Sequence, residues 1–283
     1  MTAISAQMIK ELRDRTGIGM GKCKEALQEA SGDMELAIAN LRKAGLAQAA
    51  KKMERETNEG IIRSEKSEKA ISLIEVNAET DFVVKNEKFQ KFSQDLAKEV
   101  LQVMPNSVEE FLQSKLSTDS EQTVDQARAS IVQTLGENIQ VKRVEIFPCK
   151  EGHSIGVYSH AGGKLVCLVE ISGSDKQQEL AKDIAMHIAA EAPEYISSDE
   201  IPERVIEHEK EIARAQVAGK PPQIIEKIIT GKLNAYFDQV CLLPQKFVKD
   251  TSVTIAEHLE KQGKESGESL KITQFLRWQV GAQ

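Results

Sequence analysis

The sequence contains few cysteines, and they are widely spaced. None of the four forms part of a C-x-x-C pair: Cys23, Cys149, Cys167 and Cys241. Structural zinc sites and disulfide frameworks both need cysteines at short, regular spacings. We therefore expect neither kind of site, and we expect these thiols to be buried in a protein of the reducing cytoplasm.

Long apolar runs are also absent. No stretch approaches the roughly 20 apolar residues that are needed to span a bilayer, and the first residues lack the apolar segment of a secretory signal. We therefore expect a soluble, cytoplasmic protein without a membrane partner.

The sequence shows little clustered positive charge. The formal net charge is −7, and residues 1–55 hold ten Lys and Arg against seven Asp and Glu, so the excess negative charge lies beyond them. Neutralising the phosphates of a nucleic acid requires clustered Lys and Arg. This distribution argues against nucleic acid as the main ligand.

No set of residues with catalytic or metal-binding spacing is found. Residues 152–156 read Gly-His-Ser-Ile-Gly, which matches the G-x-S-x-G turn of α/β-hydrolases. That turn needs a strand before the serine and a helix after it, whereas a β-hairpin is predicted here, which disfavours an esterase acting through Ser154. His187 lies beside Ile184 and Ile188 without a second ligand at metal spacing, so we interpret it as a core residue. We expect no enzyme, no metal and no cofactor.

The residues that are present indicate a helix-rich protein with more than one domain. Hydrophobic residues make up 40% of the 283 and charged residues 29%, which is typical of globular proteins, and the length exceeds that of a minimal core. We predict an α+β fold. The predicted divisions are a helical domain with its linker (1–55), a first core subdomain (56–140), the first part of a second core subdomain (141–195), an inserted helical hairpin (196–244) and the last part of the second subdomain (245–283).

Three short helices are predicted in the first segment. Ser5 and Asp33 occupy N-cap positions, while Gly17 and Gly45 follow apolar runs as helix ends. A three-helix bundle of this kind is similar to ubiquitin-associated domains, so an adaptor that binds ubiquitin-like proteins is an alternative function. Residues 46–58 predict a helical linker.

The middle of the chain contains a faint repeat. Residues 60–76 and 156–171 each predict a β-hairpin, and helical spacing of apolar residues follows each one. Two repeated α+β subdomains with antiparallel sheets are therefore expected. A helix over 124–135, ended by Gly136, and a strand over 139–146 are predicted between them, and a last strand over 270–280.

Residues 196–244 interrupt the repeat. They predict two amphipathic helices, over 200–218 and 223–237, joined by a Gly-Lys-Pro-Pro turn at 219–222. A lone helical hairpin buries little apolar surface. We therefore expect it to pack on another element, such as a second copy of itself.

Residues 79–84, Glu-Thr-Asp-Phe-Val-Val, connect a predicted strand to a helix that begins near Asn86. Connections of this kind lie on the surface and carry function, and this one places Phe82 between a carboxylate and two valines. The ring could enter a pocket on another protein or fold back as an apolar staple under its own helix. Spacing alone leaves both possibilities open.

Several motifs in order resemble bacterial translation elongation factor Ts over nearly the whole chain. They are residues 16–20 (Thr-Gly-Ile-Gly-Met) with 23–27 (Cys-Lys-Glu-Ala-Leu), 80–83 (Thr-Asp-Phe-Val), 136–139 (Gly-Glu-Asn-Ile) before Arg143 and Val144, and 184–190 (Ile-Ala-Met-His-Ile-Ala-Ala). The resemblance implies a nucleotide exchange factor for the GTPase elongation factor Tu. It also implies a ubiquitin-associated-like module, two core subdomains and a coiled-coil insertion that mediates self-association.

The resemblance further implies roles for individual residues. The residues that match the functional tip, whose phenylalanine wedges between partner helices and disturbs the partner's Mg²⁺ site, are Thr80, Asp81, Phe82 and Val83. Those that match further contact positions are Met20, Leu135, Gly136 and His160. Gly21 stands where some members have a second methionine. Some members also continue into a C-terminal helix, whose contacts are not carried over.

Overall fold

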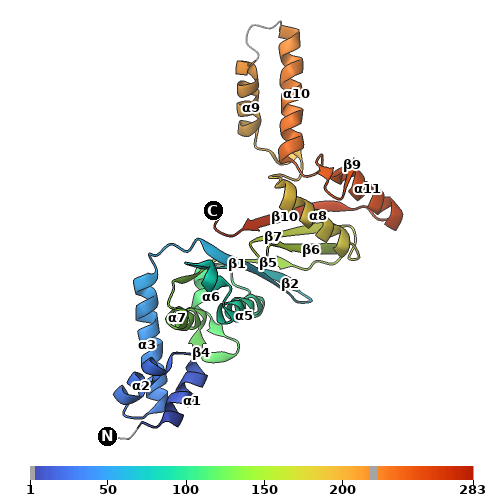
Figure 1. The fold of residues 1–283 in the computed structure, drawn as a ribbon. Helices are drawn as coiled ribbons and strands as arrows, with labels where there is room; N and C mark the ends of the chain where they lie inside the picture. Colours follow the sequence, from blue (N-terminus) through green and yellow to red (C-terminus); the bar gives the residue numbers. More distant parts are fainter. Residues whose placement is uncertain (1–3, 217–221, 283) are drawn as a thin grey trace. The chain divides into compact units, whose positions relative to one another are not determined.

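The computed structural model describes residues 4–216 and 222–282. The chain separates into two compact units, each described here by itself. The first comprises Met1–Pro148, Gly162–Lys164 and Gln279–Gln283, and the second Cys149–Ala161 and Leu165–Trp278. Both combine helices with antiparallel strand pairs (Figure 1), which confirms the α+β class. Within the described residues, no helix combines the length and the apolar character needed to cross a membrane.

Three helices open the first unit: α1 (Ala6–Thr16), α2 (Met20–Glu29) and α3 (Met34–Lys52). The predicted caps are present, since the Ser5 hydroxyl accepts the Met8 N–H at 3.2 Å and the Asp33 carboxylate accepts the Leu36 N–H at 3.0 Å. Gly17 ends α1 with φ 70°. Leu12 and Leu27 are fully buried in the core that these helices share.

The predicted end of the third helix at Gly45 is wrong. Helix α3 continues through Gly45 to Lys52 and packs against α7 (Val124–Leu135). A β-carbon at Gly45 would lie 3.1 Å from the Gln133 Oε1 and 3.5 Å from the Ala129 carbonyl oxygen. The glycine therefore allows two helices to approach closely, and it does not mark a helix end.

The first unit contains a three-stranded sheet in the order β1-β2-β5. The elements around it are β1 (Glu59–Lys66), β2 (Ala70–Ala78), α5 (Glu87–Val103), α6 (Val108–Gln113), β3 (Lys115–Leu116), β4 (Asp119–Thr123) and β5 (Ile139–Pro148). Ile61 pairs with Val76, and Ile74 pairs with Val144. Because β5 pairs with β2, the division between the units follows Pro148, whereas the sequence placed it between residues 140 and 141.

The second unit repeats this plan with a sheet in the order β10-β7-β6. Its elements are β6 (His153–His160), β7 (Leu165–Ser172), α8 (Gln178–Glu191), β8 (Lys246–Phe247), β9 (Asp250–Thr254), α11 (Ile255–Ser266) and β10 (Lys271–Gln279). Helix α8 packs against β6 and β7, and Ile171, Ile184 and Ile255 are fully buried in the core.

The repeat extends further than the sequence analysis found. In both units a short hairpin, β3–β4 or β8–β9, leads into a helix that begins with a reciprocal capping box. Thr123 and Gln126 form the first box, and Thr254 and Glu257 form the second. The same spacing joins Lys115 to Thr123 and Lys246 to Thr254 in the sequence.

The inserted hairpin belongs to the second unit and contains η1 (Ser198–Glu200), α9 (Glu203–Gln216) and α10 (Pro222–Val240). The two helices lie side by side (Figure 1). Residues 217–221, which hold most of the predicted turn, lie outside the described residues. At the base, the Tyr195 N–H donates to the Val240 carbonyl at 3.1 Å and the Leu242 N–H donates to the Tyr195 carbonyl at 2.8 Å. The chain therefore leaves and returns at one place.

Candidate functional site

Residues 79–84 do not form an open loop, because Asp81–Val84 make a one-turn helix, α4. Thr80 caps it in an extended conformation, and its hydroxyl accepts the Val83 N–H at 3.4 Å. Asn86 then caps α5, with its side-chain oxygen accepting the Lys88 N–H at 2.9 Å. Two successive caps thus hold a single helical turn between β2 and α5.

The apolar residues of this turn point in different directions. Val84 is buried, and Val83 packs against the core of the first unit. Phe82 is 81% exposed, more than any other large hydrophobic residue among those described. The staple alternative is therefore wrong. Because a ring of this size normally contributes apolar burial, its exposure makes residues 80–83, which we call the tip, the candidate functional site.

A charged pair lies beside the exposed ring. The Lys85 Nζ donates to the Asp81 carboxylate at 2.6 Å, one helical turn away. This hydrogen bond holds the pKa of the Asp81 carboxyl below its usual value and raises the pKa of Lys85. Both side chains are exposed to solvent, which screens the pair. The tip therefore presents an ionised carboxylate next to its phenyl ring.

A second segment, residues 135–138, is hydrogen-bonded to the base of the tip. The Glu137 carboxylate accepts the Thr80 N–H at 3.0 Å through Oε2 and the Thr80 hydroxyl at 2.7 Å through Oε1. In the opposite direction, the Glu79 Oε1 accepts the Asn138 N–H at 2.6 Å. We call these four residues the crossed clamp.

The end of α7 supplies the geometry of this second segment. Gly136 ends the helix with φ 82°, in the left-handed region that glycine adopts readily, and its carbonyl accepts a hydrogen bond from the Lys52 ammonium of α3. Leu135 packs against the core, while Gly136 is exposed. The structure thus brings Leu135 and Gly136 to the base of the tip.

The other two predicted contact residues lie elsewhere. Met20 is the first residue of α2 and is 49% exposed, and no atom would touch a β-carbon at the neighbouring Gly21. His160 is exposed at the end of β6 in the second unit, where its Nδ1 lies 3.2 Å from the Tyr158 hydroxyl. Sequence reasoning missed Glu79, Glu137 and Asn138, although all three lie within or beside its motifs.

Ser154 does not have the geometry of a hydrolase nucleophile. It is fully buried within β6, which pairs antiparallel with β7. Its hydroxyl donates to the Ser174 carbonyl at 2.9 Å and accepts the Gln177 N–H at 2.8 Å. Both hydrogen bonds tie the connection between β7 and α8 to the sheet, so the serine has a structural role.

His187 and Cys167, both buried in the second unit, are also unsuited to catalysis. His187 Nδ1 accepts the Val248 N–H at 3.3 Å, so its Nε2 carries the proton and donates to Gln245 at 2.9 Å. Burial lowers the pKa of His187, and burial raises the pKa of Cys167 to about 12. Among the described residues, no group of three or more His, Cys, Asp or Glu could hold a metal ion.

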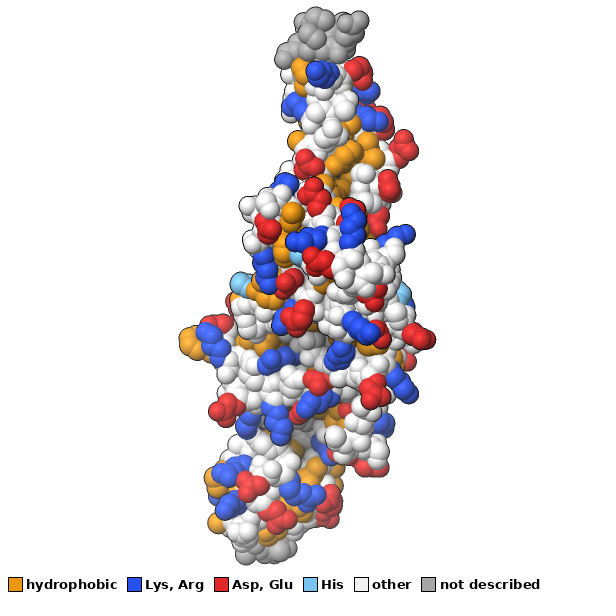
Figure 2. Space-filling view, turned by 90° about the vertical axis from the view of Figure 1, so that its right-hand side faces the viewer, with side chains coloured by type: hydrophobic (Ala, Val, Ile, Leu, Met, Phe, Trp, Pro, Cys, Tyr) orange, Lys and Arg blue, Asp and Glu red, His pale blue; other side chains and the backbone are white. Residues whose placement is uncertain are grey.

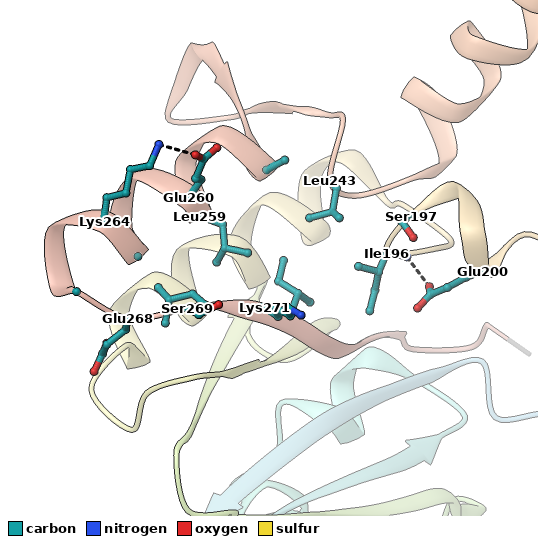
Figure 3. Close-up of a pocket in the computed structure, with 15 residues that line it drawn as sticks. Ile196, Ser197, Glu200, Leu243, Leu259, Glu260, Lys264, Glu268, Ser269 and Lys271 are labelled. Carbon is teal, nitrogen blue, oxygen red and sulfur yellow. Dashed lines mark hydrogen bonds and ion pairs between the residues drawn. The ribbon is translucent and has the colours of Figure 1, made fainter.

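A groove of about 770 Å³ lies in the second unit, between α11, β10 and residues 196–200 (Figure 3). Two of its carboxylates have close partners: Glu260 pairs with Lys264 at 2.5 Å, and Glu200 accepts the Ile196 N–H at 2.7 Å. In Figure 3 these two interactions lie on opposite sides of the groove, and they do not converge on a common point as the polar groups of an active site would.

Comparison with known proteins agrees with the motifs. The family model for Elongation factor TS matches residues 79–282, from the crossed clamp to the last strand. The Elongation factor Ts of Protochlamydia amoebophila (strain UWE25) is 56% identical over 281 residues, covering 99% of this chain and 100% of that protein. The Elongation factor Ts of Chlamydia muridarum (strain MoPn / Nigg) is 45% identical over 282 residues, covering 100% of both chains. The chain therefore belongs to the elongation factor Ts family of translation elongation factors.

Proposed function

We propose that this protein is a guanine-nucleotide exchange factor that promotes GDP release from the GTPase elongation factor Tu. The observation that carries the proposal is the 81% exposure of Phe82 on a turn that two segments hold in place. A large ring kept in water costs free energy unless a partner covers it. Residues 80–83 are therefore proposed to be the part that acts on the partner.

In the proposed mechanism, Phe82 inserts between helices of the GTPase and displaces the Mg²⁺ beside its nucleotide. Mg²⁺ neutralises the phosphates of a bound nucleotide, so its loss weakens GDP binding. The exchange factor has no bond to make or break in this scheme, which agrees with a site that consists of a ring, a screened ion pair and two caps. It needs no cofactor of its own.

Energetic coupling requires contacts beyond Phe82. Binding that loosens a nucleotide must itself be loosened by that nucleotide, by the same factor. A thousandfold loosening corresponds to about 4 kcal/mol, whereas burying one phenylalanine supplies about 1.5–3 kcal/mol. We propose that the remainder comes from the other contact residues: Met20 of the ubiquitin-associated-like bundle, Leu135 and Gly136 beside the tip, and His160 of the second unit.

We further propose that residues 196–244 form a coiled-coil hairpin through which two copies associate. Partly buried Val205, Ile206, Tyr236 and Phe237 pack at its base, and Ile212 is 39% exposed on α9. Hydrophobic side chains are visible on the surface of the described part of the hairpin (Figure 2). An amphipathic hairpin with apolar residues facing solvent is suited to packing against another helix. The alternative of a ubiquitin-like-binding adaptor would use residues 1–55 alone and leaves the exposed tip without a role.

The direct test is the release of labelled GDP from elongation factor Tu, followed by fluorescence with and without this protein. The protein should accelerate release when it is present in much smaller amounts than the GTPase, because an exchange factor turns over. Release at the spontaneous rate, by protein shown to be folded by circular dichroism, would rule out the exchange function.

A further inference from the structure

We infer that Glu137 is a positioning residue for Phe82, and that the crossed clamp fixes the direction in which the ring points. The inference rests on the proposed function for its effect on exchange. Its effect on the tip itself can be measured whether or not that function holds.

Helix α4 is too short to be stable without outside support. It has four residues, and forming a first helical turn fixes several dihedral angles in return for a single hydrogen bond. Phe82 is 81% exposed, so the backbone of residues 80–83, and not packing of the ring, sets the direction in which its Cα–Cβ bond leaves the chain. Whatever holds this backbone therefore also positions the ring.

Glu137 controls both polar groups of the capping residue. One carboxylate oxygen accepts the Thr80 N–H at 3.0 Å, and the other accepts the Thr80 hydroxyl at 2.7 Å. Because the hydroxyl hydrogen is directed at Glu137, the hydroxyl oxygen is left to accept the Val83 N–H. Hydrogen bonds to an ionised group are stronger than those between neutral groups. Glu137 thus fixes the start of α4 and the orientation of its cap together.

The other half of the clamp fixes Glu137 in turn. Glu79 accepts the Asn138 N–H at 2.6 Å, and the Asn138 side-chain amide donates to the Arg55 carbonyl at 2.8 Å. Asn138 is fully buried. Glu137 thus holds Thr80, the residue after Glu79, while Glu79 holds Asn138, the residue after Glu137. A shift of either segment alone would break these hydrogen bonds.

The clamp is built on rigid elements. Gly136 joins it to α7, whose Val132 and Ala129 are buried, and Lys52 of α3 donates to the Gly136 carbonyl. On the other side, Val84 is buried in the same core. The tip is thus pre-organised for its partner, which reduces the ordering cost of binding.

The first test measures the tip in the free protein. Glu137→Ala should accelerate hydrogen exchange at the amides of Val84 and Lys85, which donate to Thr80 and Asp81 within α4, and leave the β2 amides unchanged. Glu68→Ala, which removes an exposed carboxylate between β1 and β2, is the matched control. Unchanged protection of α4 in a folded Glu137→Ala protein would overturn the inference.

The second test is a double-mutant cycle on GDP release. Glu137→Ala should reduce the acceleration about two- to tenfold, the cost of ordering a loosened tip. In a Phe82→Ala background it should cause a much smaller further loss, because its main effect on exchange is exerted through the ring. An equal loss in both backgrounds would mean a general structural role and would contradict positioning.

A milder pair of variants keeps the inference testable if Glu137→Ala does not fold. Thr80→Val replaces the hydroxyl with a methyl group and should loosen α4, whereas Thr80→Ser keeps the hydroxyl and should retain wild-type protection. If the wild type fails to accelerate GDP release, the exchange function fails while the hydrogen-exchange result still decides whether the clamp orders the tip. If the wild type is active, α4 is loosened and exchange is unchanged, the positioning role fails and the exchange function stands.

Discussion

The connection between β2 and α5 and the connection between β7 and α8 occupy the same place in the two sheet-and-helix repeats, yet they differ in form. The first forms α4 and exposes Phe82. The second, which contains the buried Ser174, is tied to β6 by both hydrogen bonds of the Ser154 hydroxyl. The scaffold therefore does not need an exposed aromatic residue at this step. The exposure of Phe82 must serve something other than folding.

The largest effect on activity is expected from Phe82→Ala. Truncating an anchor at the centre of an interface typically costs about 2 kcal/mol or more, so the acceleration of GDP release should fall at least about tenfold. Because the ring is exposed, the free energy of unfolding should change by less than about 0.5 kcal/mol. Fluorescence of labelled GDP and urea denaturation give the two values.

Met104→Ala is the matched control for this change. Met104 is a large apolar residue of the first unit with 44% exposure, and it lies after α5, away from the tip in sequence. Its truncation should leave the acceleration within about twofold of wild type, as expected for a residue outside a hot spot. Equal losses from both substitutions would show that any exposed apolar residue matters.

Ser154→Ala should have the opposite profile, with a loss of stability and no loss of exchange. The substitution removes the hydrogen-bond partner of the Gln177 N–H and of the Ser174 carbonyl in a buried site, at a cost of about 1–3 kcal/mol. Urea denaturation should show this loss, while the folded variant exchanges GDP normally. Hydrolysis of an ester substrate that disappears with the substitution would instead revive the esterase.

A smaller effect is expected from pH, and it should come from the second unit. Burial holds the pKa of His187 below its ordinary value of 6.5. As the pH falls, this side chain is therefore protonated in the unfolded chain before it is protonated in the folded protein. The contribution of neutral His187 to the free energy of unfolding should therefore be fully present above pH 6.5 and should decrease as the pH falls below that value.

Urea midpoints at pH 7.5, 6.5 and 5.5 measure this dependence. His187→Gln should make it shallower, whatever its absolute stability. Some dependence should remain, because burial also lowers the pKa of His258. An unchanged slope in the variant would show that His187 does not contribute.

Removing the hairpin should also have only a small effect on exchange. Because Tyr195 and Leu242 are hydrogen-bonded at its base, a short Gly/Ser linker can replace residues 203–238 without stretching the chain. The variant should be monomeric by light scattering and should retain most of its exchange activity. Loss of exchange, with circular dichroism showing a folded core, would mean that the hairpin contacts the GTPase.

Much of the fold could be predicted from local patterns, and the errors have physical causes. The helix over 124–135 and its end at Gly136 are confirmed, because apolar spacing and a left-handed glycine both act locally. Gly45 misled the prediction because its role depends on α7, a distant helix. The β3–β4 and β8–β9 hairpins escaped detection because β3 and β8 have only two residues each.

The tip was found from the sequence, but its support was not. A phenylalanine on a strand-to-helix connection can be recognised without a structure, whereas the pairing of Thr80 with Glu137 joins segments 57 residues apart. Both residues occurred in motifs that carried the family resemblance. Only the fold shows that the two motifs contact each other and that one holds the other in place.

The most direct test of the account is a titration of the GDP release rate against the concentration of this protein, with wild type and Phe82→Ala. If Phe82 acts as a wedge that displaces Mg²⁺, the variant should show a lower plateau at saturation, because the bound complex itself releases GDP more slowly. An unchanged plateau that is only reached at higher concentrations would mean that Phe82 merely anchors the complex, and it would contradict the account.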